Sequence, residues 1–422
     1  MTGDGRPAGS DDQSAARPAQ APPAGTVGRR SSAKSTPAVN GSLAGNDIPA
    51  DAAGPGVAVA KRTTRTKPSA RPAPGRQPTV HDVARAAGVS ASTVSRALHG
   101  RGYASPEVRE LVAAAAARIG YVADANARSL RVRTSTTVGV LISDLRNPYY
   151  AVLAAGIEAT LTAGGKHMVL VNDDSDPAKE ATAVAAFASM RVCGVIVTPV
   201  SERVARAATQ FGLPIVCVDR PAGRARTDVV MADDHAGGRL VTTHLLQAGR
   251  SPVAILLDEQ RWSTGAGRLA GYRAALVAAG MKADDDLVQM TSWRAEDAAA
   301  STYALLARRP DIRALITANN VLAQGAFTAL RVAGLVIGRD VALASFDDLP
   351  WMTMVDPPVT AITQHPFEIG RRAAEVLLER LERDTVDAGG AAEAGGVGAT
   401  DVRAVVRDLI EPQLIIRAST TG

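Results

Sequence analysis

Aromatic side chains are scarce in this sequence, and several of them follow short apolar runs. Only 3% of the 422 residues are Phe, Trp or Tyr. The rings that follow such runs closely are Tyr149, Tyr150, Trp262, Trp293 and Trp351. Flat apolar faces stack on sugar or nucleobase rings, and Asp or Arg side chains satisfy the polar groups of such rings. Rings at several strand ends therefore indicate a small-molecule site, although core packing is the commoner role of a single Trp.

A second set of chemically useful side chains lies in the stretch TVHDVARAAGVSASTVSRALHG, residues 79–100. Small residues let a helix approach base edges in a major groove, and Ser and Thr hydroxyls bond to phosphates or bases. Arg96 can bond to a guanine through two of its nitrogens. The side chains expected to meet DNA here are Thr79, Ser90, Ala91, Ser92, Thr93, Ser95, Arg96 and His99. A pair of ordinary surface helices is the alternative, because such pairs joined at a Gly are common.

Two short helices must position these groups. Helical spacing of apolar residues predicts a first helix that buries Val80, Val83, Ala84 and Ala87. Gly88 supplies the left-handed backbone that ends this helix, and Ser90 caps the next one. The inward side chains of the second helix are Val94, Ala97 and Leu98. The stretch is therefore predicted to be a helix-turn-helix.

A third helix is predicted to follow. Ser105, Pro106 and Glu107 are a cap, a proline at the first helical position and an acid in the first turn. The apolar face of this helix is formed by Val108, Leu111, Val112, Ala115 and Ile119. Gly120 and Tyr121 end it. The stretch VADANARSLRVR that comes next is too short and too basic for a core helix.

From Thr137 onward, short apolar runs alternate with helix-length segments. The runs occupy residues 138–142, 167–171, 194–200, 214–219, 228–233, 253–258, 314–317 and 341–346. Such alternation predicts an α/β fold of parallel sheets covered by helices. Eight strands are many for one sheet, so two lobes of the periplasmic-binding-protein type are expected. Near the end we expect a helix at 373–384, a flexible Gly/Ala-rich loop at 387–401 and a closing strand at 414–417.

The ordered series VHDVARAAGVSASTVSRAL, SPEVRELVAAAAARIGYV and ANARSLRVRTSTTVGVLI resembles the LacI/GalR (lactose-repressor-like) family of bacterial transcription regulators. The resemblance implies a hinge helix at 123–135 that folds on DNA and inserts Leu130 into the minor groove. The hinge residues expected at the DNA are Asn126, Arg128, Ser129 and Leu130, with Arg131 beside the backbone. Ala123 and Asp124 depart from the Pro and Asn usual in the family, so a less stiff hinge is expected, and an acid near phosphates weakens binding.

The resemblance also implies an effector site between the lobes, at positions that follow the predicted strands. These positions are Tyr149, Tyr150, Asp219, Trp262, Thr264, Arg268, Trp293, Asn320, Asp347 and Trp351. Arg268 has the strongest match among them.

Charge divides the chain unevenly. Residues 1–78 carry 11 basic and 5 acidic side chains and residues 79–135 carry 8 and 4, so a net charge of −5 is left for residues 136–422. A basic front on an acidic body fits a nucleic-acid-binding end joined to a different domain. Residues 1–77 lack apolar periodicity, so they are predicted to be a disordered basic tail. Its basic run at 61–67 is as consistent with phosphate contacts as with a plain linker.

Several other classes of site have little support in the sequence. Cys193 and Cys217 lie in apolar runs and are expected to be buried free thiols. The six His residues show no metal-ligand spacing, no hydrolase motif stands out, and the stretch GAGRLAG (265–271) only half-matches a dinucleotide fingerprint. We therefore expect no catalysis, no metal and no cofactor. No apolar run suits a membrane span or signal peptide, which predicts a cytoplasmic protein.

The expected domains are a tail at 1–77, a helix-turn-helix domain at 78–122, the hinge at 123–135 and an effector-binding and dimerisation body at 136–422. The expected function is sequence-specific repression of transcription, with operator affinity controlled by a small molecule, best a sugar or sugar derivative. A purine- or nucleoside-responsive regulator and a solute-binding protein of a transport system are the alternatives. No heptad follows Arg417, so a homodimer reading a near-palindromic operator is expected rather than a tetramer.

Overall fold

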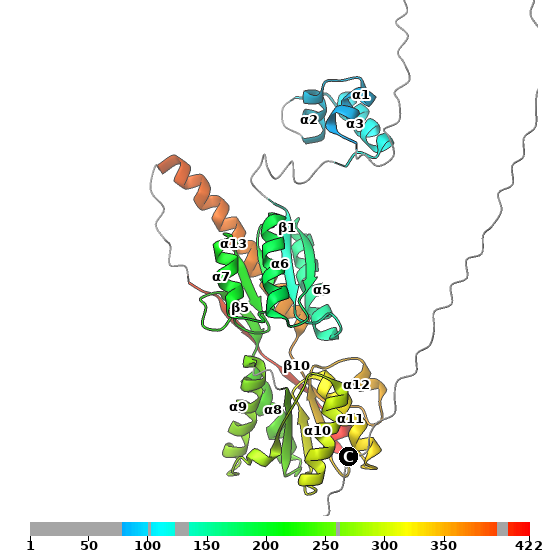
Figure 1. Cartoon of the computed structure of the whole chain (residues 1–422), viewed down its shortest axis with the longest axis vertical. Coiled ribbons are helices and arrows are strands. Elements are labelled where there is room, and N and C mark those ends of the chain that lie inside the picture. The colour runs from blue at the N-terminus through cyan, green and yellow to red at the C-terminus, as the bar shows by residue number, and fades with distance from the viewer. Residues whose placement is uncertain (1–77, 100–102, 123–134, 259–261, 395–403) are drawn as a thin grey trace, which may run out of the picture. The chain divides into compact units, whose positions relative to one another are not determined.

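The computed structural model describes residues 78–99, 103–122, 135–258, 262–394 and 404–422 (Figure 1). For His99 and residues 385–394 the description covers the backbone only. The predicted tail and residues 123–134 of the predicted hinge lie outside these ranges, together with the candidate DNA contacts Asn126, Arg128, Ser129 and Leu130. Within the described ranges, none of the helices is both long and apolar enough to cross a membrane.

The first domain is a bundle of three short helices. They are α1 (Val80–Ala87), α2 (Ala91–His99) and α3 (Pro106–Ile119). Val83, Val94 and Val112, one from each helix, are fully buried in its core. Gly88 has a φ of 69°, the left-handed backbone that glycine adopts without steric cost, so the predicted end of α1 is confirmed. The prediction for Leu111 is wrong, because its side chain is 50% exposed.

Side-chain caps fix where these helices begin. The backbone N–H of Thr93 donates to Ser90 Oγ at 3.1 Å, and that of Val108 donates to Ser105 Oγ at 3.4 Å. Thr79 and Asp82 bond reciprocally at the start of α1. Each bond satisfies a backbone donor that the first helical turn leaves free. The two predicted caps, Ser90 and Ser105, are therefore confirmed.

The first lobe is a six-stranded parallel sheet in the order β11-β5-β4-β3-β1-β2. Its strands are β1 (Thr137–Ile142), β2 (His167–Asn172), β3 (Val195–Val197), β4 (Ile215–Val218), β5 (Asp228–Ala232) and β11 (Arg407–Ile410). Helices α5 (Pro148–Ala163) and α13 (Pro366–Ala394) share one apolar core with the sheet. A second core contains side chains of α6 (Pro177–Ser189) and α7 (Arg203–Gln210).

The second lobe repeats this plan in the order β12-β10-β9-β8-β6-β7. Its strands are β6 (Val253–Asp258), β7 (Val288–Thr291), β8 (Ala314–Thr317), β9 (Ala342–Phe346), β10 (Thr360–Thr363) and β12 (Gln413–Ile415), of which only β12 pairs antiparallel. Helix α8 (Asp234–Gln247) packs on α9 (Ser263–Ala278), and α10 (Ala295–Arg308) packs on α11 (Asn320–Val332). The short elements are η1 (Asp285–Leu287), α12 (Trp351–Met354) and α14 (Ala418–Thr421).

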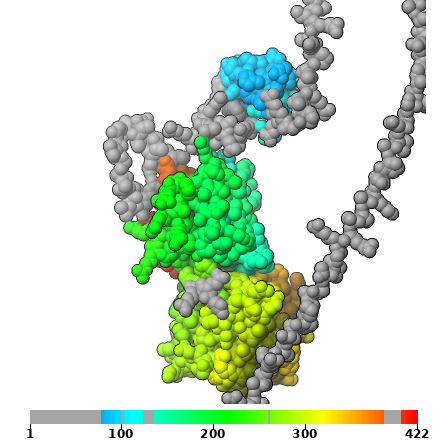
Figure 2. Space-filling model, in the orientation of Figure 1, coloured from blue at the N-terminus to red at the C-terminus, as the bar shows by residue number. Residues whose placement is uncertain are grey.

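The chain passes between the lobes at Asp233, at residues 364–365 and at residues 411–412. Each lobe is therefore built from separate stretches of sequence, and α13 returns the chain from the second lobe to the first (Figure 1). Figure 2 shows the surface of the first lobe, mainly teal to green, next to that of the second lobe, mainly yellow-green to yellow. The predicted two-lobed α/β fold is confirmed.

Some details of the predicted body are corrected. All eight apolar runs contain strands, but β7, β10 and β11 lie outside those runs, and β12 begins one residue before the predicted closing strand. Residues 387–394, predicted as part of a flexible loop, continue helix α13, whereas residues 395–401 lie outside the described ranges. Both cysteines are free thiols, of which Cys217 is buried and Cys193 only half-buried.

Candidate functional site

Two adjoining cavities lie between the lobes, where strands of both sheets end. The inner cavity has a volume of about 20 Å³ and the outer cavity about 300 Å³. Tyr150, Arg220 and Trp293 line both of them. Since 20 Å³ is room for about one water molecule, side chains themselves fill the inner cavity in this conformation.

Each cavity has walls from both lobes. The other residues of the inner cavity are Asn147, Tyr149, Asp219, Asp258, Thr264, Arg268, Asn319, Asp347 and Gln364. The other residues of the outer cavity are Ser143, Asp144, Arg146, Asp174, Ser175, Trp262, Ser292 and Arg294. A ligand in either cavity would therefore contact both lobes at once.

Asp219 organises the first-lobe side of the inner cavity. It follows β4 in the left-handed conformation (φ 69°) and is 7% exposed. The hydroxyl of Tyr149 donates to its carboxylate at 3.2 Å, and that of Tyr150 at 3.5 Å. Nη1 of Arg220 completes the group at 2.9 Å. Both tyrosines come from the first turn of α5, so strand and helix ends converge on one carboxylate.

Arg220 links the lobes although it was not predicted as a site residue. Its Nε donates to the carbonyl oxygen of Pro199 at 2.7 Å and its Nη2 donates to Ser143 Oγ at 2.8 Å. With Nη1 bonded to Asp219, the guanidinium plane is fixed, and the Trp262 ring of the second lobe lies 4.1 Å from its central carbon. Such a cation–π contact stabilises the closed arrangement of the two lobes.

Arg268 organises the opposite wall. Its Nε donates to Asp234 at 2.7 Å, its Nη1 donates to the carbonyl oxygen of Ala318, and its plane lies over the Phe346 ring at 4.4 Å. In the amide orientation that satisfies both neighbours, Gln364 accepts from Arg268 at 2.7 Å and donates to Asp347 at 2.6 Å. On the side of the second lobe that faces the cavities, hydrogen bonds therefore connect Asp234, Arg268, Gln364 and Asp347.

Two glycines allow α8 and α9, which carry Asp234 and Arg268, to pack closely. A Cβ at position 238 would lie 2.3 Å from the carbonyl oxygen of Arg268, and one at position 271 would lie 2.1 Å from that of His235. Only glycine fits at Gly238 and Gly271 at this spacing. The close packing of α8 on α9 therefore sets the distance between Asp234 and Arg268.

A direct hydrogen bond also joins the lobes. Nδ2 of Asn320, at the start of α11, donates to Oδ1 of Asn147 at 2.9 Å and to Oδ2 of Asp347 at 2.8 Å. Asn147 caps α5 through the backbone N–H of Tyr149. The starts of one helix from each lobe are therefore tied to each other.

Burial raises the pKa values of the carboxyl and tyrosine hydroxyl groups around the inner cavity. It raises the pKa of Asp234 to about 7 although Arg268 acts in the opposite direction, and it also raises the pKa of Asp347. The tyrosines follow the same rule, since burial and then the neighbouring Asp219 raise the pKa of Tyr149 and Tyr150. These shifts arise because a buried carboxylate or phenolate loses hydration.

The structure brings most of the ring-bearing and polar candidates together but not all of them. Tyr149, Tyr150, Asp219, Thr264, Arg268, Trp293 and Asp347 line the inner cavity, and Trp262 lines the outer one. Asn320 reaches the site through Asp347. Trp351 lines neither cavity and packs edge-on against Phe327, with 6.3 Å between ring centroids.

The DNA-binding candidates occupy the first turns of α2 and its cap. Ser90, Ser92 and Arg96 are exposed, whereas Ala91, Thr93 and Ser95 are half-buried. Arg96 Nε donates to the carbonyl oxygen of Ser92 at 3.3 Å, and Thr79 lies at the start of α1.

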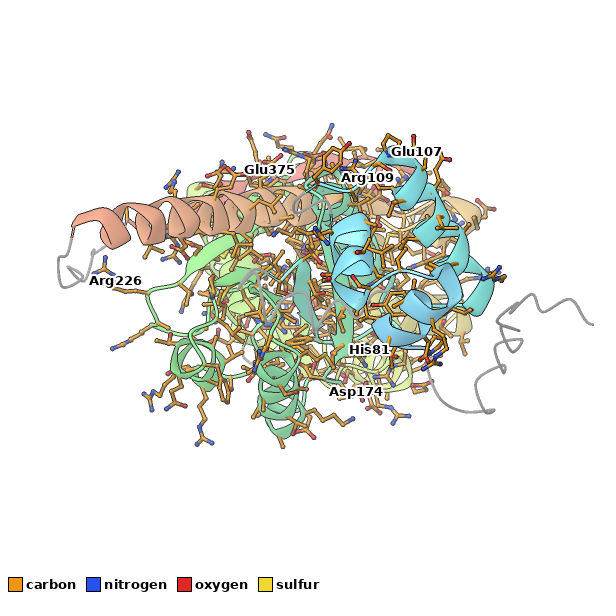
Figure 3. All side chains as sticks on the ribbon, turned by 90° about the horizontal axis from the view of Figure 1, so that it is seen from above. His81, Glu107, Arg109, Asp174, Arg226 and Glu375 are labelled. Carbon is orange, nitrogen blue, oxygen red and sulfur yellow. The ribbon has the colours of Figure 1, made fainter. Side chains whose placement is uncertain are left out.

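Other side chains of this domain also face outward. Figure 3 shows His81, Glu107 and Arg109 on its surface, and all three are exposed. Tyr103, which the sequence reasoning did not select, is 86% exposed between α2 and α3.

Comparison with known proteins assigns both parts of the chain. Residues 79–124 match the pattern of bacterial regulatory proteins of the lacI family. Residues 135–392 match that of periplasmic binding proteins and the sugar-binding domain of the LacI family. The transcriptional regulator CelR of Thermobifida fusca is 32% identical over 74% of this chain and 94% of its own length. The repressor PurR of Haemophilus influenzae is 30% identical over 81% and 98%.

Solved structures agree with this assignment. A complex of CelR with cellobiose superposes with a TM-score of 0.60 at 28% identity, covering 81% of this chain and all of that one. The lac repressor dimer bound to operator and an anti-inducer gives a TM-score of 0.70 at 25% identity, with 82% and 100% coverage. The chain therefore belongs to the LacI family of bacterial transcriptional regulators.

Proposed function

We propose that this protein is a dimeric repressor whose affinity for a near-palindromic operator is controlled by a carbohydrate bound between its lobes. The observation that carries the effector part is the pair of cavities with walls from both lobes, where rings lie beside Asp and Arg side chains. Such walls suit a sugar, which presents apolar ring faces and hydroxyl edges. The CelR–cellobiose complex supports the same ligand class.

The proposed DNA site is the exposed surface of α2 together with the hinge. Ser90, Ser92 and Arg96 read the major groove, and Leu130 of the hinge inserts into the minor groove of a CpG-like centre. Two copies in a dimer read two half-sites, as the lac repressor dimer on its operator does. As a regulator the protein works in the cytoplasm and catalyses no reaction.

Control of DNA affinity follows from thermodynamic linkage. A ligand that contacts both lobes stabilises one lobe arrangement, and that arrangement changes the spacing of the two hinges in the dimer. DNA affinity then changes by the same factor as ligand affinity. The contacts between Asn147 and Asn320 and between Arg220 and Trp262 are the ones that a change of lobe arrangement would remake.

A purine effector is the second candidate. PurR is among the relatives, and the rings and carboxylates of the cavities can also bind a nucleobase. A solute-binding protein is less well supported, because the capped three-helix domain has no role in solute transport.

The direct test combines operator selection with effector titration. A duplex selected from random DNA by the full-length dimer is labelled, and its binding is followed by fluorescence anisotropy at fixed salt with and without each sugar or purine. We expect one sugar to change the Kd, and Leu130→Ala to weaken binding strongly. Unchanged binding by Leu130→Ala would refute the hinge assignment, and a response to purines alone would refute the carbohydrate.

A further inference from the structure

Strand β11 forms one edge of the first-lobe sheet. Among the described strands it pairs only with β5, and on that side the carbonyl oxygen of Ile410 accepts from the backbone N–H of Asp233. Successive residues of a strand point their backbone groups to opposite sides, so those of Arg407 and Leu409 point away from the sheet. Two N–H donors and two C=O acceptors therefore have no strand partner among the described residues.

The side chains of this edge only partly protect it against pairing. Proteins usually shield a free edge with charges or proline. Arg407 is charged, but Leu409 is apolar and 52% exposed. Both side chains lie on the α7 face of the sheet, because their partners Val229 and Met231 pack in the core that contains α7. The edge therefore offers an apolar contact as well as backbone groups.

Five exposed arginines lie on this side of the lobe. They are Arg203 and Arg206 of α7, Arg224 and Arg226 of the loop between β4 and β5, and Arg407 of β11. Among the described residues, their guanidinium groups have no ion-pair or hydrogen-bond partner. The only acid within residues 202–210 and 223–227 is Glu202. Figure 3 shows Arg226 pointing away from the lobe.

Contacts place the elements that carry these arginines beside one another. A Cβ at Gly223 would lie 2.3 Å from Cγ of Glu202, so the loop at 223–227 touches the start of α7. Just after this loop, the carboxylate of Asp228 accepts from the backbone N–H of Val406 at 2.8 Å. The five arginines therefore form a row, here called the arginine row, from α7 across the loop to β11.

Arginines near an edge strand of the other lobe are paired. At the start of β7, Arg273 bonds to Asp285, and Arg309 bonds to Asp284 and Asp311. Residues 136–422 carry a net charge of −5, so the arginine row is a positive surface on a negative body. Such a surface attracts an acidic partner.

The backbone groups and the charges together decide between possible occupants. The phosphates of a DNA backbone accept hydrogen bonds but cannot donate to the outward carbonyl oxygens of β11. A second copy of this chain could supply a strand, but its arginine row would meet this one, and like charges repel each other. An acidic peptide in extended conformation supplies donors, acceptors and negative charge at once.

We propose that β11 is a docking site for an acidic extended segment of another protein, which adds a strand to the first-lobe sheet. The backbone of this segment pairs with Arg407 and Leu409, and its carboxylates meet the arginine row on the α7 face. Its side chains on the opposite face lie beside the half-buried Ile410. The surface gives the regulator a protein partner in addition to DNA and effector.

The test is fluorescence anisotropy of short labelled peptides titrated with the full-length protein. In one peptide glutamate alternates with valine. In the matched peptide proline replaces each valine, which keeps the charge and the length but prevents a regular strand. We expect the valine peptide to bind about tenfold more tightly than the proline peptide, and its affinity to fall as salt is raised.

Three variants locate the bound peptide. Leu409→Pro removes an outward N–H but none that faces β5, and should reduce the affinity for the valine peptide to that for the proline peptide. Arg224→Ala combined with Arg226→Ala should weaken binding of the valine peptide several-fold. The control, Arg239→Ala combined with Arg313→Ala, removes two exposed arginines of the second lobe that also lack ion pairs, and should change nothing.

Each contrary outcome overturns a stated part of the proposal. Equal binding of the two peptides, or binding of neither, overturns the added strand, and this comparison stands even if Leu409→Pro lowers the melting temperature. Full affinity for the valine peptide after loss of Arg224 and Arg226 overturns the role of the arginine row. Weaker operator binding by that double variant in a gel shift at fixed salt assigns the row to DNA and overturns the protein partner.

Discussion

Replacing Arg268 with alanine tests whether the buried ions of the inner cavity depend on one another. Arg268 is 6% exposed and donates to Asp234 at 2.7 Å, while Gln364 connects it to Asp347. Alanine would leave two buried carboxylates without their cation. Breaking a buried pair in this way costs about 3–5 kcal/mol, a large part of the roughly 5–15 kcal/mol that stabilises a domain.

The assay is urea unfolding of the full chain followed by tryptophan fluorescence. Arg273→Ala is the matched control, because it removes an arginine from the same helix that bonds to Asp285 with side chains 46% and 87% exposed. An exposed pair contributes no more than about 1 kcal/mol. The two variants should therefore differ by a few kcal/mol at about pH 8.

The loss should also depend on pH. The pKa of Asp234 is already raised to about 7, and removing Arg268 raises it further, since Arg268 is the main influence that lowers it. Below neutral pH the carboxyl becomes protonated and needs no cation, so the destabilisation of Arg268→Ala should shrink between about pH 8 and pH 5.5. A loss equal to that of Arg273→Ala, or one independent of pH, would refute the coupling.

Other perturbations follow from single contacts. Between pH 3.8, its ordinary pKa, and about pH 7, Asp234 binds more protons in the folded than in the unfolded chain, so its contribution to stability is lost as the pH rises. Asp234→Asn should therefore reduce the dependence of the unfolding free energy on pH, measured by urea unfolding at a series of pH values. Arg96→Ala should weaken operator binding by about 1–3 kcal/mol and remove the preference at one base pair in a gel-shift competition, whereas Arg226→Ala on the body should change nothing. Gly88→Ala should cost about 1 kcal/mol through its φ of 69° alone, since nothing lies within 4 Å of an added Cβ; faster hydrogen exchange in α1 and α2 would report it.

The three-helix domain was predictable because its signals are local. Ser90, Ser105 and Gly88 act on backbone groups within four residues of themselves, so sequence alone places the helix ends. The prediction for Leu111 was wrong because its burial depends on contacts that are not local. Leu111 and Val112 are both apolar, and only the packing of α3 on the other helices selects Val112 for the core.

The strands that were not predicted are short and lack an apolar signal. β7 reads VQMT, β10 reads TAIT and β11 reads RDLI, and none of them has the run of branched apolar residues seen in β6. β10 is buried because β9 and β12 flank it, and β12 lies about fifty residues later in the chain. Their place in the sheets is therefore a property of the tertiary fold.

The sequence predicted which residue types form the candidate site but not which side chains contact one another there, and the reason is physical. Asp219 could be found because it ends a strand, but Arg220 beside it became a site residue only through Ser143 and Trp262, which lie far away in sequence. Gln364 follows a strand that had no signal of its own. The buried charged side chains of the inner cavity are hydrogen-bonded to their protein neighbours. A ligand that enters this cavity must therefore replace several of these hydrogen bonds together. That competition ties ligand binding to lobe arrangement, because the Asn147–Asn320 bond and the Arg220–Trp262 contact hold the lobes together at the same place.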